Sequence, residues 1–107
     1  MNKQLKLWVD DIRDAPYDSW HIARTPWDAL VMLSTNQYSM VSLDHDLNGL
    51  IGNKELTGKD ILLWLIQRHN DGYPIPDIIR VHTANPVGRK DMIDLLKRYI
   101  PTHTDER

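Results

Sequence analysis

The chain of 107 residues has a length typical of one domain, and we expect a single domain over residues 1–107. A formal net charge of −2 excludes a general attraction to double-stranded nucleic acid or acidic membranes, so any anion must be held by local groups. The absence of cysteine excludes disulfides, thiolate catalysis and cysteine-ligated metals. No apolar stretch approaches the ~20 residues of a membrane span or resembles a signal peptide, which predicts a cytoplasmic protein, in the host cytoplasm if a phage encodes it.

Strand and helix patterns alternate along the first half of the chain. Residues 5–9 are a short apolar run that predicts a strand ending at Asp10, and residues 20–24 predict a second strand. A helix is expected to begin at Thr25-Pro26, because threonine caps helices and proline fits the first helical position. Residues 40–43 predict the third strand.

The same alternation continues in the second half. A capping pattern at residues 57–60 predicts the start of a helix that ends near Gly72. Residues 78–81 predict the fourth strand, and Asn85-Pro86 opens a last helix that a later proline ends. We expect the tail, residues 102–107, to be disordered.

Strands that alternate with helices indicate an α/β fold with a parallel sheet. We expect three layers, with about four strands flanked by about three helices. Ligands of such sheets bind beyond the carboxyl ends of the strands, which meet at one edge. Three of the expected strand ends carry polar residues, namely Asp10-Asp11, Asp44-His45-Asp46 and His82-Thr83. We therefore expect these residues to converge.

Each of these groups also has an ordinary structural explanation. Asp10 and Asp11 fit loop caps, Asp44 and Asp46 fit turn residues, and His82 fits a hydrogen-bonded core histidine. Their combination is harder to explain in this way, because carboxylates gathered at one edge repel one another unless a cation lies among them or some are protonated. Oxygen ligands without cysteine favour Mg²⁺ or Mn²⁺, whereas the histidines would favour a softer metal.

The motifs at these strand ends resemble those of response-regulator receiver domains, and more closely those of cyclic-phosphate-processing receiver domains. The resemblance rests on four segments, which are Val9–Arg13 (VDDIR), Ala23–Thr25 (ART), Ser42–Leu47 (SLDHDL) and His82–Gly88 (HTANPVG). It spans residues 5–99 and implies a receiver-like, flavodoxin-like fold. LDHDL together with HTANPVG is its most specific part.

The resemblance also implies roles for single residues. Asp10, Asp11 and Asp44 would bind Mg²⁺ or Mn²⁺, and Asp44 would correspond to the aspartate that accepts a phosphoryl group in receivers. The Thr83 hydroxyl would contact the phosphoryl oxygens, and the backbone carbonyl of Asp46 would complete the metal coordination.

Two departures from an ordinary receiver argue against phosphorelay signalling. Residues 13–19 are too few and too polar for the usual first helix. The chain also ends after the helix that follows Thr83, so the fifth strand, its lysine and the last helix are expected to have no counterpart. In receivers that lysine pairs with the phosphoaspartate. Groups that a plain receiver lacks stand in their place, namely His45, Asp46, His82 and Asn85.

The family implies activity on a cyclic phosphate, either nucleotide-derived or at the end of a broken RNA. We expect a metal-dependent phosphoesterase in which His45 or His82 acts as general acid or base. The helix start at Asn85 would present N–H groups to an oxyanion, and arginines would contact the phosphate. The predicted catalytic residues are Asp44, His45, Asp46, His82 and Thr83. The predicted substrate-binding residues are Arg13, Arg24, Asn85, Gly88 and Arg89.

Other interpretations stay open. Asp44 either attacks phosphorus and forms an aspartyl-phosphate, or holds the metal while water attacks, and the missing lysine favours water. Trp20 or Trp27 would stack on a base if the substrate is a nucleotide. Two alternatives are not enzymes: a degenerate receiver that acts by phosphoryl acceptance or partner binding, and a protein that sequesters a cyclic nucleotide.

Overall fold

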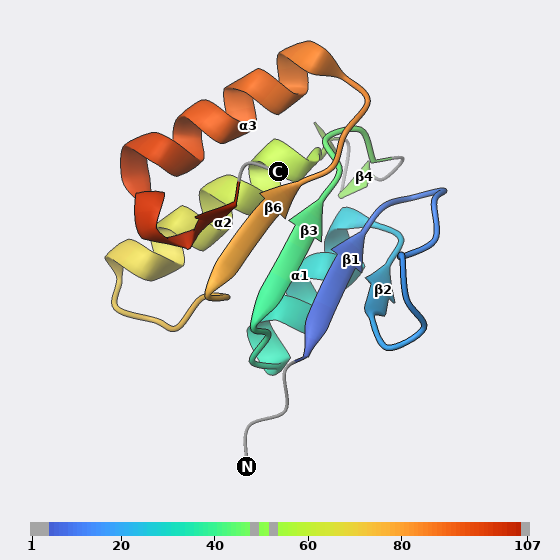
Figure 1. Cartoon of the computed structure of the whole chain (residues 1–107), viewed down its shortest axis with the longest axis horizontal. Helices are drawn as coiled ribbons and strands as arrows, with labels where there is room; N and C mark the ends of the chain where they lie inside the picture. Colours follow the sequence, from blue (N-terminus) through green and yellow to red (C-terminus); the bar gives the residue numbers. More distant parts are fainter. Residues whose placement is uncertain (1–4, 48–49, 52–53, 106–107) are drawn as a thin grey trace.

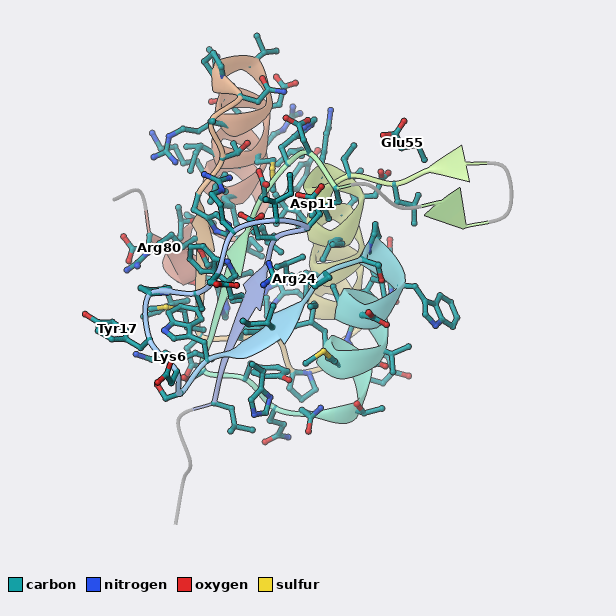
Figure 2. The ribbon with its side chains drawn as sticks, turned by 90° about the vertical axis from the view of Figure 1, so that its right-hand side faces the viewer. Lys6, Asp11, Tyr17, Arg24, Glu55 and Arg80 are labelled. Carbon is teal, nitrogen blue, oxygen red and sulfur yellow. The ribbon has the colours of Figure 1, made fainter. Side chains whose placement is uncertain are left out.

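Five parallel strands form the main sheet, in the order β2-β1-β3-β6-β7 (Figure 1). The computed structural model describes residues 5–47, 50–51 and 54–105. The strands of this sheet are β1 (Lys6–Val9), β2 (His21–Ala23), β3 (Met40–Leu43), β6 (Ile78–Val81) and β7 (Thr104–Asp105). Two further short strands, β4 (Leu50–Ile51) and β5 (Lys54–Glu55), pair antiparallel and project from the main body beyond β3 (Figure 2).

The three α-helices begin where their capping residues predict. They are α1 (Pro26–Thr35), α2 (Gly58–Asn70) and α3 (Pro86–Tyr99). The Thr25 hydroxyl accepts the Asp28 N–H at 3.1 Å, and the Thr57 N–H donates to the Asp60 carboxylate at 2.8 Å. Such caps satisfy N–H groups that the first helical turn leaves unpaired. Among the residues described, no helix is long and apolar enough to cross a membrane.

All three helices pack on the same face of the sheet. One core cluster contains alternate residues of β1, β3 and β6 together with buried residues from α1, α2 and α3. The strand residues in it are Leu7, Val9, Val41, Leu43, Ile79 and Val81. Because side chains alternate between the two faces of a strand, the other residues of these three strands point the other way. Figure 2 shows two of them, Lys6 and Arg80, on the side opposite to α1.

The other face carries no helix among the residues described. The fold therefore has two layers, and the expectation of three layers is wrong. Crossovers between parallel strands are right-handed. Those from β2 to β3, from β3 to β6 and from β6 to β7 all run in one direction along the sheet, and their helices therefore share one face. Only the step from β1 to β2 runs in the opposite direction, and its segment, residues 10–20, forms no helix. The α/β class, the parallel sheet and the three helices are confirmed.

The tail is ordered as far as Asp105, which corrects both the expected disorder and the expected absence of a fifth strand. A 3-10 turn at Pro101–His103 leads into β7, which pairs parallel with β6. The Arg80 guanidinium lies 2.7 Å from the Asp105 carboxylate across this pair. Residues 106–107 lie outside the described residues. A strand of two residues has no periodicity, so its pairing with β6 could not be read from the sequence.

Candidate metal and phosphate site

Three carboxylates converge at the carboxyl edge of the sheet. Asp10 and Asp11 follow β1, and Asp44 follows the neighbouring strand β3. One oxygen of each residue lies within 4.8 Å of the others, and Asp10 and Asp44 are only 1% and 5% exposed. Figure 2 shows Asp11 on the loop beyond the end of β1. The predicted convergence is confirmed, while the bound metal stays a prediction.

The backbone of Asp44 is fixed between two elements. Its N–H donates to the Val9 carbonyl of β1 at 2.9 Å. On the other side, the Gly58 N–H at the start of α2 donates to the His45 carbonyl at 2.8 Å. A Cβ at Gly58 would lie 1.8 Å from the Asp44 carbonyl oxygen, so the helix approaches this closely only because residue 58 is glycine. Sequence reasoning assigned Gly58 no part in the site.

Arg13 lies against two of the three carboxylates. Its Nε–H donates to Asp10 Oδ2 at 2.9 Å, and one terminal nitrogen lies 3.2 Å from Asp44 Oδ2. The N–H groups of Ile12 and Arg13 donate to Asp10 Oδ1 at 2.9 and 2.8 Å. Burial acts to raise the pKa of Asp10, but these hydrogen bonds and the Arg13 charge outweigh it and lower that pKa. Asp10 is therefore ionised at neutral pH.

Both ring nitrogens of His82 are engaged. Nε2 lies 3.1 Å from Asp10 Oδ2 and donates to that carboxylate, and Nδ1 accepts from the Ser42 hydroxyl at 2.6 Å. The ring stacks on Trp8 with centroids 3.7 Å apart and planes 9° apart. Burial lowers the pKa of His82, although the hydrogen bond and the charge of Asp10 act to raise it. The lowered pKa favours the neutral ring. This arrangement orients Asp10, and it leaves no ring nitrogen for a substrate. Ser42 had no assigned role in the sequence analysis.

His45 is held at one nitrogen only. Its Nδ1–H donates to Asp46 Oδ1 at 2.8 Å, and this hydrogen bond lowers the pKa of Asp46 more than burial raises it. Asn85 Nδ2 adds a longer contact to the same carboxylate, at 3.4 Å. A Cβ at Gly88 would lie 2.5 Å from His45 Cγ, so the ring packs directly on the α3 backbone. Among the described residues, none donates to or accepts from Nε2 of His45.

The start of α3 uses its polar groups internally. The Asn85 side-chain oxygen accepts the Gly88 N–H at 3.0 Å, and the Thr83 hydroxyl accepts the Asn85 N–H at 3.2 Å. The Gly88 N–H, which was expected to face an oxyanion, is therefore taken by the cap. The structure gives Gly88 a different part, which is to leave room for His45.

Two of the predicted phosphate-binding arginines hold the backbone of the site. Arg24 donates to the carbonyls of Asp10 and Arg13 at 3.2 and 2.7 Å and pairs with Asp14. Arg89 donates to the Val81 carbonyl of β6 at 2.7 Å. Of the three arginines predicted to bind phosphate, Arg13 alone contacts carboxylate oxygens of the cluster in the part of the chain that the structure describes.

Exposed apolar side chains follow three of the strands that end at this edge. Ile12 follows the carboxylate pair, Trp27 lies in the first turn of α1, and Val87 lies in the first turn of α3, and all three are largely exposed. Trp20 is buried and packs edge-on against Trp8, with centroids 5.7 Å apart, so it is not available to stack on a base. Trp27 keeps that possibility.

Three comparisons with known proteins were made, and one of them identifies a family. A search of curated proteins and a search of solved structures each found no match. The family model of the cyclic-phosphate processing receiver domain matches residues 5–98, which include β1, the carboxylate loops and nearly all of α3. The chain therefore belongs to the family of cyclic-phosphate processing receiver domains.

Proposed function

We propose that this protein is a metal-dependent phosphoesterase that opens a cyclic phosphate. The observation that supports the proposal is that the Asp10–Asp11–Asp44 cluster and the His45–Asp46 pair follow adjacent strand ends at one edge of the sheet. The first group suits a divalent cation and the second suits proton transfer. Each of them accelerates the hydrolysis of a phosphate ester at neutral pH.

Asp10, Asp11 and Asp44 would hold Mg²⁺ or Mn²⁺. Their fit to a cation is supported by the contact of two of them with the Arg13 guanidinium, a positive group that offsets part of their negative charge. When bound, the ion would offset the charge of the phosphate and increase the acidity of a water molecule. His82 and Ser42 would keep Asp10 in position for it.

His45 would transfer the proton. In the reaction a water oxygen bonds to phosphorus, one ring P–O bond breaks, and the departing oxygen takes up a proton, which gives a phosphate monoester and an alcohol. Asp46 accepts from Nδ1 and thereby fixes the ring, so Nε2 of His45 would exchange the proton with water or with the departing oxygen. His82 would not share this role, because both of its nitrogens are bonded within the protein.

Water is a better nucleophile here than Asp44. Asp44 is nearly buried, and its two oxygens contact the His45 N–H at 2.8 Å and Arg13 at 3.2 Å. One observation nevertheless favours the second candidate, a phosphoryl-accepting receiver. The β7 residues Thr104 and Asp105 include no lysine, but Arg13 places a cation beside Asp44 from a different loop. A covalent aspartyl-phosphate would distinguish this candidate from the hydrolase.

The exposed apolar residues suggest a nucleoside as the rest of the substrate. Ile12, Trp27 and Val87 are exposed and each comes shortly after a strand that ends at the charged edge of the sheet. A nucleoside cyclic phosphate likewise combines a charged part with an apolar part, because it has a charged phosphate ring at one end and a flat base at the other. Stacking on an aromatic side chain is worth ~1–3 kcal/mol per base.

The proposal is tested by incubating the protein with Mg²⁺ or Mn²⁺ and a panel of nucleoside 2′,3′-cyclic phosphates, ADP-ribose cyclic phosphates, cyclic oligonucleotides and glycerol cyclic phosphate. Hydrolysis is expected with metal and not with excess chelator, and it should be faster for the nucleoside compounds than for the glycerol compound. Asp44→Asn should abolish hydrolysis, whereas Asp94→Asn, at an exposed position of α3, should not. Metal-independent turnover, or a panel left intact, would contradict the proposal.

If the panel stays intact, two further measurements separate the alternatives. Incorporation of label from acetyl phosphate at Asp44 would identify a phosphoryl acceptor. Recovery of an unchanged cyclic nucleotide after denaturation would identify a sequestering protein.

A further inference from the structure

The guanidinium of Arg13 contacts the groups that a divalent cation would need. It lies 2.9 Å from Asp10 Oδ2 and 3.2 Å from Asp44 Oδ2, and it donates to the His82 carbonyl at 3.3 Å. One side chain thus connects the loops that follow β1, β3 and β6. We propose that Arg13 is an internal counter-ion that a divalent cation displaces and that then binds the substrate phosphate. This inference rests on the proposed metal-dependent function.

The backbone of Arg13 is fixed although its side chain is not enclosed. Its N–H donates to Asp10 Oδ1 at 2.8 Å, and its carbonyl accepts from Trp8 Nε1 at 3.0 Å and from Arg24 at 2.7 Å. The side chain is 49% exposed. The guanidinium can therefore move by rotation about its own side-chain bonds while the loop stays in place.

Arg13 and a metal ion would compete for the same oxygens. Asp10 Oδ1 already accepts two backbone N–H groups, and Asp44 Oδ1 accepts the His45 N–H. The Oδ2 atoms are the ones that face Arg13. Two positive groups that bind the same pair of oxygens repel each other strongly in a site this buried. The ion can enter only if the guanidinium leaves, so Arg13 lowers the affinity for metal when no phosphate is present.

The displaced guanidinium would remain at the edge where the phosphate binds. Arginine binds phosphate through paired N–H groups, so a phosphate would replace the carboxylates as its partner. Metal and phosphate would then each increase the affinity for the other, because each favours the displaced position of Arg13. A protein with such a displaceable counter-ion binds metal weakly when metal is present alone and more tightly when the substrate is also present.

The test measures Mg²⁺ affinity by calorimetry, with and without inorganic phosphate, in the wild type and in Arg13→Gln. Without phosphate, Arg13→Gln should bind Mg²⁺ about fivefold or more tightly than the wild type, the lower end of typical coupling between sites. Phosphate should increase the Mg²⁺ affinity of the wild type by a larger factor than that of Arg13→Gln, in which only the direct attraction between ion and phosphate remains. Arg98→Gln, which removes the same charge from the exposed end of α3, should behave as the wild type.

A measurement on the unaltered protein guards against misfolding of the variant. The Arg13 Nε–H resonance should shift when Mg²⁺ is added, and the Arg98 resonance should not. Intact Mg²⁺ binding with equal affinities in wild type and Arg13→Gln, or an unmoved Arg13 resonance, would overturn this inference alone. A wild type and an Arg13→Gln variant that both fail to bind Mg²⁺ would overturn the metal-dependent function with it.

Discussion

His45 and His82 lie at the same edge of the sheet and are similarly buried, with side chains 17% and 14% exposed. Their bonding differs. His82 joins Ser42 to Asp10 through both ring nitrogens, whereas His45 is held by Asp46 at Nδ1 alone. A ring with two fixed partners positions its neighbours, and a ring with one fixed partner can still exchange a proton. The hydrogen-bond partners of the two rings, rather than their exposure to solvent, therefore distinguish proton transfer by His45 from positioning by His82.

The largest effect expected from this comparison is on catalysis. His45→Gln should lower kcat by about 10²- to 10⁴-fold, the usual contribution of a general acid or base. Its Mg²⁺ affinity should stay close to that of the wild type, because His45 contacts Asp44 only through its backbone N–H, which His45→Gln keeps, while its ring bonds to Asp46. His103→Gln is the matched control, since His103 bonds to the Pro76 carbonyl elsewhere in the molecule. An unchanged kcat in His45→Gln would contradict the assignment of proton transfer to His45.

Gly88→Ala tests the position of the His45 ring without changing the ring. The added Cβ would lie 2.5 Å from His45 Cγ, so the ring or α3 must shift. We expect kcat to fall by up to about 10²-fold, as when a reacting group is misplaced by about 1 Å. Combining Gly88→Ala with His45→Gln should add little to His45→Gln alone, because both act through one side chain. Two full, additive losses would show that Gly88 acts elsewhere.

His82→Ala is expected to affect the metal rather than the chemical step. Loss of the hydrogen bond to Asp10 should weaken Mg²⁺ binding by about 10- to 100-fold, with kcat largely restored at saturating Mg²⁺. His82→Gln should recover part of the affinity, because an amide can still donate to Asp10. His21→Ala, which removes a histidine bonded to Tyr38, is the control for general destabilisation. A kcat that stays low at saturating Mg²⁺ would assign His82 to proton transfer instead.

Ser42→Ala should give the smallest effect of the series. It removes the hydroxyl that donates to His82 Nδ1 at 2.6 Å, inside the sheet where Ser42 is fully buried. A hydrogen bond of about 1 kcal/mol corresponds to a loss of about fivefold in Mg²⁺ affinity. Ser34→Ala, whose exposed hydroxyl donates only to the Val31 carbonyl, should have no effect. Equal behaviour of the two variants would show that Ser42 does not act through His82.

The sequence by itself determined the order and starts of the main elements. Thr25 with Pro26, Thr57 with Asp60, and Asn85 with Pro86 each predicted a helix start that the structure confirms. These signals work because capping joins groups three residues apart along the chain. The sequence also determined that Asp10, Asp11 and Asp44 would meet, because parallel strands end at one edge.

Only the tertiary structure decided which face of the sheet the helices cover and what each polar group does there. Strand β7 depends on its pairing with β6 and on the contact between Arg80 and Asp105, and a two-residue strand leaves no pattern in the sequence. His82 contacts Ser42 and Asp10 across separations of 40 and 72 residues. Hydrogen-bond partners at such separations depend on the register of neighbouring strands and on packing, so the sequence alone could name these residues but could not assign their roles.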